Sequence, residues 1–235
     1  MARAGMRASA FLNGLVKCLE GAPLVSCGAH HKVNMGQCVL CSADGGGCMD
    51  ENTVRRRSIA IPRLQPVETD ADIERLAKLA HEIWFEYWPA HIGEAQTRYM
   101  VERFQTAEAI RRDMASSAYE YWFVLAPDDG RVVGYTGGRA EPKTGRFFIS
   151  KIYLRACERG RHFASGVIAF YEDLRRERGL RAMYLTVNKG NVLGIRAYKG
   201  NGFKVIDAVE TDIGQGFVMD DYIMEKHVDE GAPGC

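Results

Sequence analysis

Residues 153–202 of this chain read YLRACERGRHFASGVIAFYEDLRRERGLRAMYLTVNKGNVLGIRAYKGNG. They overlap an aromatic and β-branched run over 147–154 that is typical of a strand. From Phe163 onward, apolar residues recur at helical spacing until Gly179, where the helix is expected to end. A second strand is expected over 183–188 and a short helix over 191–202. This order of strand, loop, helix, strand and helix predicts a cofactor-binding site.

The loop between the first strand and the helix reads Arg159-Gly160-Arg161-His162-Phe163-Ala164. A glycine-bearing turn that opens a helix exposes backbone N–H groups, and the helix dipole adds partial positive charge. Arg159 and Arg161 would strengthen the attraction for a pyrophosphate. By itself such a turn is more often a plain connection, so its interpretation as an anion site depends on the motifs around it.

The ordered motifs resemble those of the GNAT superfamily of acetyl-CoA-dependent N-acetyltransferases. The family's loop motif, Arg/Gln-x-x-Gly-x-Gly/Ala, corresponds to residues 159–164, with His162 where the family usually has a glycine that lets the backbone approach the cofactor phosphates. Its Val-Asn, Asn and Tyr-x-x-x-Gly-Phe signature corresponds to Val187-Asn188, Asn191 and residues 198–203. Taken singly, the two asparagines would be a strand end and a helix N-cap.

The resemblance covers residues 58–228, which are expected to form a single acetyltransferase domain. It implies a mixed, mostly antiparallel α/β sheet of about six or seven strands flanked by helices. Residues 211–224 also resemble bacterial members related to polyamine (spermidine/spermine) acetyltransferases.

In the family, two adjacent parallel strands splay apart and leave a cleft for the pantetheine arm; here these strands would end at Leu154 and Asn188. The resemblance implies that the Leu154 N–H polarises the thioester carbonyl and that Tyr198 is the general acid that protonates the leaving thiolate. The residues it implies in acetyl-CoA binding are Ile152, Tyr153, Leu154, Arg159, Gly160, Arg161, His162, Phe163, Ala164, Asn188, Asn191 and Tyr198.

The acceptor is expected to be a small-molecule amine or a peptide amine. Its predicted contacts combine aromatic rings with carboxylates, a lining that suits a cationic amine, and they are Trp84, Glu86, Trp88, Phe217 and Asp220. The alternative for Trp84 and Trp88 is an i,i+4 pair in the core. The general base is left open among Glu82, Glu86, Asp220 and Asp221, acting through water.

Residues 1–54 differ in kind, because they hold five of the seven cysteines. Cys38 and Cys41 have the two-residue gap that lets both sulfurs reach one metal. Three interpretations stay open: a zinc site, an iron-sulfur or thiol-redox site, and an unstructured extension. The candidate ligands are Cys27, His30, Cys38, Cys41 and Cys48, with Cys18 and His31 as further choices. Residues 229–235 are expected to be a flexible tail.

The composition describes a globular protein of 235 residues with 46% hydrophobic residues and a formal net charge of +1. So small a charge gives no electrostatic case for nucleic acid. No apolar run approaches the roughly 18 residues of a membrane span. Lys17 and Glu20 interrupt the apolar amino-terminal segment, which disfavours export, and the use of acetyl-CoA favours the cytoplasm. Assembly is left open, with a homodimer as one option.

Two other classes of function compete with the enzyme. One is a non-catalytic acyl-CoA-binding sensor whose Cys-rich amino terminus responds to metal or redox state; His162 favours it, and Tyr198 disfavours it because binding alone needs no acid beside the sulfur. The other is a zinc-finger nucleic-acid binder, which the absence of a basic patch and of finger spacing disfavours.

Overall fold

The computed structural model describes residues 61–227. The predicted metal ligands Cys27, His30, Cys38, Cys41 and Cys48 lie outside the described residues, as do the tail at 229–235 and the domain boundaries at 54, 58 and 228. The described elements are, in chain order, β1 (Arg63–Pro66), α1 (Asp70–Tyr87), α2 (Pro89–Ile92), α3 (Glu94–Phe104), α4 (Ala107–Ser117), β2 (Glu120–Leu125), β3 (Val132–Glu141), β4 (Arg146–Leu154), the 3-10 turn η2 (Ala156–Glu158), α5 (Phe163–Glu177), β5 (Ala182–Asn188), α6 (Val192–Gly200), β6 (Lys204–Gly214) and β7 (Phe217–His227).

The strands form one seven-stranded sheet in the order β1-β2-β3-β4-β5-β7-β6. Every neighbouring pair is antiparallel except β4 and β5, which run parallel. The predicted fold class, a mixed and mostly antiparallel α/β sheet, is therefore confirmed. β2 and β3 form a hairpin, and β1 lies at one edge of the sheet.

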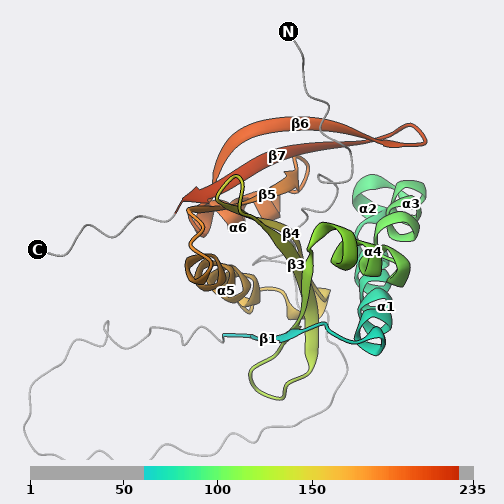
Figure 1. Ribbon diagram of the computed structural model, residues 1–235. Coiled ribbons are helices and arrows are strands. Elements are labelled where there is room, and N and C mark those ends of the chain that lie inside the picture. The colour runs from blue at the N-terminus through green and yellow to red at the C-terminus, as the bar shows by residue number, and fades with distance from the viewer. Residues whose placement is uncertain (1–60, 228–235) are drawn as a thin grey trace, which may run out of the picture.

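Helices cover both faces of this sheet, with α1–α4 on one side and α5 on the other (Figure 1). The first helix begins with a capping box, in which Thr69 and Asp72 satisfy each other's backbone N–H groups. Its apolar stripe, including Leu76 and Ile83, is buried as the helical spacing predicts. We call the sheet face under α1–α4 the acceptor face and the one under α5 the α5 face.

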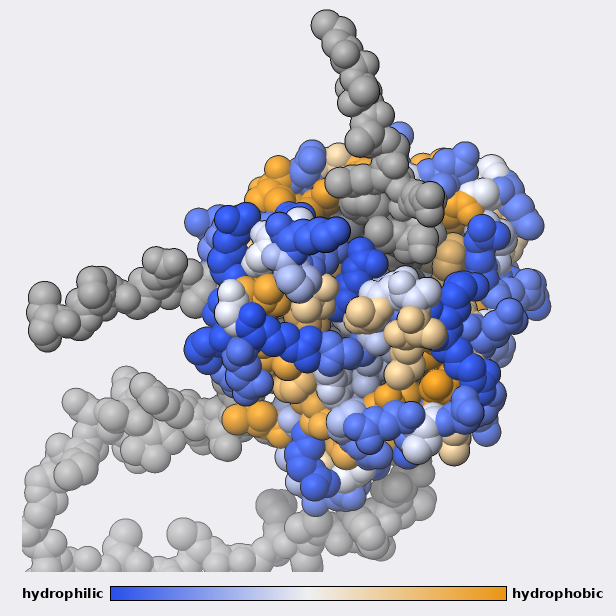
Figure 2. All heavy atoms as spheres, in the orientation of Figure 1, coloured by the Kyte–Doolittle hydropathy of each residue, from blue (hydrophilic) through white to orange (hydrophobic). Residues whose placement is uncertain are grey.

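The two sheet faces carry separate hydrophobic cores. Tyr153 and Phe148 of β4 pack into the core of the acceptor face, whereas Ile152 and Leu154 pack with α5 on the other. On the side of the molecule drawn in Figure 2, hydrophilic residues form most of the surface and apolar residues form small separate patches. No helix within residues 61–227 is long and apolar enough to cross a membrane.

The parallel pair β4/β5 separates part of the way along its length. Register pairs run from Arg146↔Ala182 to Phe148↔Tyr184 and then stop, although both strands continue to Leu154 and Asn188. On the other side of β4 the register shifts between Gly137 and Gly138 of β3, which leaves Ser150 as a bulge. β5 stays paired with β7 along its whole length. A wedge therefore opens between the carboxyl ends of β4 and β5, as predicted.

Candidate active site

The end of β4 presents backbone groups to this wedge. The Arg155 N–H donates to the carbonyl of Val133 on the β3 side at 2.9 Å. Successive residues of a strand direct their N–H groups to opposite edges, so the N–H of Leu154 is directed toward the wedge. The predicted backbone contacts at Ile152, Tyr153 and Leu154 lie at the opening between the two strands.

Two residues of the loop before α5 have a left-handed backbone conformation. Gly160 has φ 75° and His162 has φ 61°, after which α5 begins at Phe163. The left-handed conformation costs a residue with a Cβ roughly 1–2 kcal/mol, and glycine adopts it without that cost. His162 therefore holds a glycine-like backbone conformation under strain.

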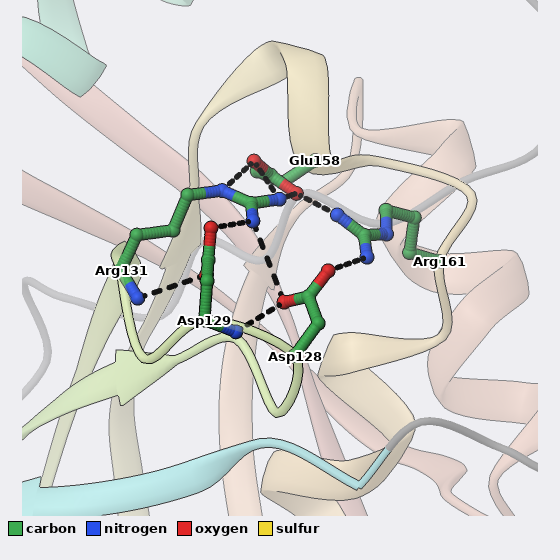
Figure 3. Close-up of polar contacts among 5 residues, drawn as sticks. All are labelled: Asp128, Asp129, Arg131, Glu158 and Arg161. Atoms are coloured by element: carbon green, nitrogen blue, oxygen red, sulfur yellow. Dashed lines mark hydrogen bonds and ion pairs between the residues drawn. The ribbon is translucent and has the colours of Figure 1, made fainter. Parts of the chain in front are cut away.

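A charged network ties this loop to the turn between β2 and β3 (Figure 3). Arg161 donates to Glu158 at 2.8 Å and to Asp128 at 3.1 Å, and the bond from Arg161 lowers the pKa of Asp128. Arg131 binds the same Glu158 carboxylate at 2.9 and 3.1 Å and Asp129 at 2.7 Å. Three carboxylates against two guanidinium groups give the network a net charge of −1. Arg161 thus anchors the loop.

Arg159 is placed differently. Its guanidinium lies over the ring of Tyr87, 4.9 Å from the centroid, and burial lowers its pKa. Its Nε is buried without a hydrogen-bond partner among the described residues. A buried, unpartnered guanidinium nitrogen beside the first turn of α5 fits an anionic group such as a pyrophosphate.

The two predicted asparagines shape the segment after β5. Asn188 Oδ1 accepts the Gly190 N–H at 2.9 Å, and Asn191 Oδ1 caps α6 by accepting the Gly194 N–H at 2.9 Å. Asn188 therefore acts as a strand-end residue and Asn191 as a helix N-cap, the two structural roles expected of them when each is taken singly. They fix the start of the helix that carries Tyr198, which is 1% exposed and packs edge-on against Phe203.

Tyr198, Tyr153 and Asp221 come together at the wedge from α6, β4 and β7. Burial raises the pKa of Tyr153 well above its ordinary range, and the neighbouring Tyr135, Tyr198 and Asp221 raise it further. Asp221 lies directly opposite Asn188 in the register of β5 and β7 and is 2% exposed. Burial, followed by the charge of Asp220, raises the pKa of Asp221 to about 7, while a hydrogen bond from the Asn188 side chain opposes the shift.

Two of the predicted acceptor contacts are core residues. Trp84 and Trp88 are 0% and 2% exposed, and their rings pack 5.6 Å apart on the acceptor face. The i,i+4 pair is thus packed in the core as the alternative describes, because the hydrophobic face of α1 turns toward the sheet, and its contact with an acceptor stays a prediction.

The other candidate carboxylates have defined partners. Glu86 accepts the Ala156 N–H at 3.2 Å, and Glu82 accepts from Arg155 at 2.8 Å, so both attach the segment after β4 to α1. Asp220 forms an ion pair with Lys189. Phe217 is half-buried and packs 5.3 Å from the ring of Tyr99.

Sequence reasoning missed Lys151, which is fully buried on β4. Its Nζ donates to the Tyr121 hydroxyl at 2.6 Å, and burial lowers its pKa to about 8. Its signal was a single lysine inside an otherwise apolar strand. Sequence reasoning also missed the roles of Glu158, Asp128 and Asp129, because the network joins two segments that lie about 30 residues apart in the sequence. Among residues 61–227, no group of His, Cys, Asp and Glu side chains is arranged to hold a metal.

Comparison with known proteins identifies the same fold. Residues 77–203 match the profile of the acetyltransferase (GNAT) family. The structure resembles PaiA N-acetyltransferase from Thermoplasma acidophilum in complex with coenzyme A, with 19% identity over 71% of this chain and 99% of that one and a TM-score of 0.58.

Two further solved structures share this fold. A chimera of spermidine N-acetyltransferase SpeG from Vibrio cholerae and hSSAT has 18% identity over 71% of this chain and 95% of that one, with a TM-score of 0.55. A phosphinothricin acetyltransferase from Sinorhizobium meliloti in complex with AcCoA has 19% identity over 74% of this chain and 92% of that one, with a TM-score of 0.52. At these identities the likeness concerns the fold.

Proposed function

Because the chain belongs to the acetyltransferase (GNAT) family, we propose that it moves an acetyl group from acetyl-CoA to a primary amine by direct attack, with Tyr198 as the general acid. The observation that carries the proposal is the wedge between β4 and β5, which opens beside the buried Tyr198. An unpaired strand edge can hydrogen-bond the amide groups of a pantetheine arm, and a buried phenol beside it can donate a proton to the thiolate that leaves the thioester.

The backbone of Ile152–Leu154 would hold the pantetheine arm as an added strand, because this edge of β4 has no register partner beyond Phe148. The Leu154 N–H would donate to the thioester oxygen and stabilise the negative charge that develops there. Arg159 and the first turn of α5 would bind the pyrophosphate. Arg161 would act indirectly, through the network that holds the loop.

The reaction needs no covalent enzyme intermediate. A neutral amine attacks the thioester carbon, the C–N bond forms, and the tetrahedral intermediate collapses as the C–S bond breaks. Tyr198 gives its proton to the departing thiolate and recovers one from the acylated nitrogen. A phenol suits this role because its ordinary pKa of about 10 lies above that of a thiol, about 8.5.

For the acceptor, we propose a cationic alkylamine, with polyamines as the first class to test. Support comes from residues 211–224, which resemble the polyamine branch of the family, and from the carboxylates near the wedge. We place the enzyme in the cytoplasm, where acetyl-CoA is available.

Thiol release from acetyl-CoA tests the proposal directly. The purified protein is assayed against spermidine, spermine, free amino acids and a peptide with a free amino terminus. We expect release of coenzyme A that depends on one of these amines and saturates with it. Tight binding of acetyl-CoA without turnover on any of them would reject the enzyme and favour the acyl-CoA sensor, and no binding at millimolar concentration would reject both.

A further inference from the structure

We propose that the Asp221 carboxylate is the general base that receives a proton from the acceptor ammonium, held between Asp221, Tyr153 and Thr186. This inference rests on the proposed acetyl transfer and names the group that the transfer still lacks.

The buried oxygen atoms without a hydrogen-bond partner among the described residues include three near the carboxyl ends of β4 and β5: Tyr153 Oη, Thr186 Oγ1 and Asp221 Oδ1. They come from β4, β5 and β7, the strands on either side of the wedge. Leaving a buried polar group unpaired costs roughly 1–3 kcal/mol, and native proteins rarely tolerate it without a functional reason. Three such atoms around one opening indicate a site that a polar ligand completes.

The register of the sheet puts these atoms on one face. Thr186 lies opposite Ile223, and Asn188 lies opposite Asp221, two residues earlier on β7. Cross-strand partners and i,i+2 neighbours share a face, and Ile223 packs against the core under α1–α4, as Tyr153 does. All three oxygens are acceptors or can act as acceptors, and an alkylammonium carries three N–H donors.

Among the carboxylates proposed as bases, Asp221 is the one poised to accept a proton. Glu82 and Glu86 are engaged by Arg155 and the Ala156 N–H, and Asp220 by Lys189. In contrast, Asp221 receives its hydrogen bond from the neutral Asn188 amide, whose oxygen is occupied by the Gly190 N–H. The remaining oxygen, Asp221 Oδ1, has no hydrogen-bond partner among the described residues.

The charged and titratable groups around Asp221 are few. They are Asp220 on its own strand, Lys189 after β5 and Tyr153 on β4, with Tyr198 of α6 next to Tyr153. Burial dominates over all of them and raises the pKa of Asp221 to about 7, a value suited to a base that works near neutral pH.

The proton balance is complete with these groups. Asp221 takes one proton from the ammonium and passes it to solvent, which leaves a neutral amine to attack the thioester. The second proton that nitrogen loses on becoming an amide replaces the one that Tyr198 gives to the thiolate. The net products are the N-acetylamine, coenzyme A and one proton.

The test is the pH profile of an Asp221→Asn variant, which keeps the side-chain shape and removes the base. With whichever panel amine the wild type acetylates, we expect kcat to fall roughly 100-fold and the limb of the wild-type kcat/KM profile near pH 7 to disappear. Affinity for acetyl-CoA should stay within a factor of about two. The matched control is Glu210→Gln, an exposed carboxylate on the neighbouring strand β6, for which wild-type kinetics are expected.

Two results would overturn the base assignment while leaving acetyl transfer intact. One is an Asp221→Asn variant that keeps its kcat and its low-pH limb. The other is a variant in which KM alone rises, which would make Asp221 an anchor for the cation. An infrared titration of the wild type against Asp221→Asn adds a readout independent of activity, since a protonated carboxyl band that titrates near neutral pH should be missing from the variant. Absence of turnover with every amine would instead reject the proposed function, and the base role with it.

Discussion

Arg161 and Glu158 form an ion pair of 2.8 Å within the loop that precedes α5, and the same carboxylate also binds Arg131 from the β2–β3 turn. Glu158 is thus shared by two guanidinium groups from distant parts of the chain (Figure 3). Its side chain is almost buried, whereas those of its two neighbours Asp128 and Asp129 are half-exposed. The shared carboxylate fixes the loop before any ligand arrives.

Replacing Glu158 should therefore cost more stability than replacing its neighbour. For Glu158→Gln we expect a loss of about 2 kcal/mol in the free energy of unfolding, because two partly buried guanidinium groups lose their common counter-charge. The matched control Asp129→Asn removes one exposed contact to Arg131 and should cost less than about 1 kcal/mol. Chemical denaturation of both variants measures the difference, and equal losses would show that Glu158 is not the centre of the network.

His162 offers a test of backbone strain beside the proposed pyrophosphate site. For His162→Gly we expect stability within about 1 kcal/mol of the wild type, since relief of the left-handed strain offsets the greater freedom of glycine in the unfolded chain. Affinity for acetyl-CoA should be preserved or improved. His162→Ala keeps the Cβ and separates strain from side-chain contact. A large loss of affinity in both variants would show instead that the imidazole binds the phosphates.

The role of Tyr198 as proton donor can be tested by removing its hydroxyl. Tyr198→Phe should lower kcat by roughly ten- to a thousandfold with little change in the affinity for acetyl-CoA, because the hydroxyl is used mainly in the transition state. Tyr222→Phe removes the hydroxyl of a half-buried tyrosine on β7 that packs against the same core as Tyr198, and it serves as the control. Steady-state kinetics and a binding titration separate the two quantities. Unchanged turnover with a proven substrate would leave water as the acid.

Much of the fold could be predicted because it depends on local patterns. The apolar spacing of α1 and α5, Gly179 after α5 and the turn between β2 and β3 act within a few residues. The order of these elements supported the resemblance to the GNAT superfamily, and that resemblance implied the wedge at Leu154 and Asn188.

The chemistry of single residues at the site depends on contacts that no local pattern contains. Asp220 and Asp221 are adjacent and identical in type, yet the alternation of β7 turns one toward Lys189 and buries the other. The sequence predicts Arg161 as a phosphate ligand, but no local pattern contains its contact with Asp128, which lies more than 30 residues earlier. Trp84 and Trp88 have a spacing that fits both a cleft and a core, and only the fold shows that Trp84 packs against both Trp88 and Tyr153.

The burial of Asp221 also predicts a pH-dependent cost to the fold. The pKa of Asp221 is raised from 3.8 to about 7 in the folded protein, so the folded state binds a proton that the unfolded chain releases over that interval. Its contribution to stability is therefore greatest below pH 4 and is lost as the pH rises through 7. A shift of this size corresponds to at most about 4 kcal/mol.

The Asp221→Asn side chain is neutral at every pH. The free energy of unfolding of this variant, measured relative to that of the wild type, should therefore rise between pH 4 and pH 8, while its turnover falls. Denaturant titrations at both pH values measure this gain, with Glu210→Gln as the control that should follow the wild type. Parallel stability curves for wild type and Asp221→Asn would mean that Asp221 ionises without penalty in the fold, and would remove the reason for its titration near neutral pH.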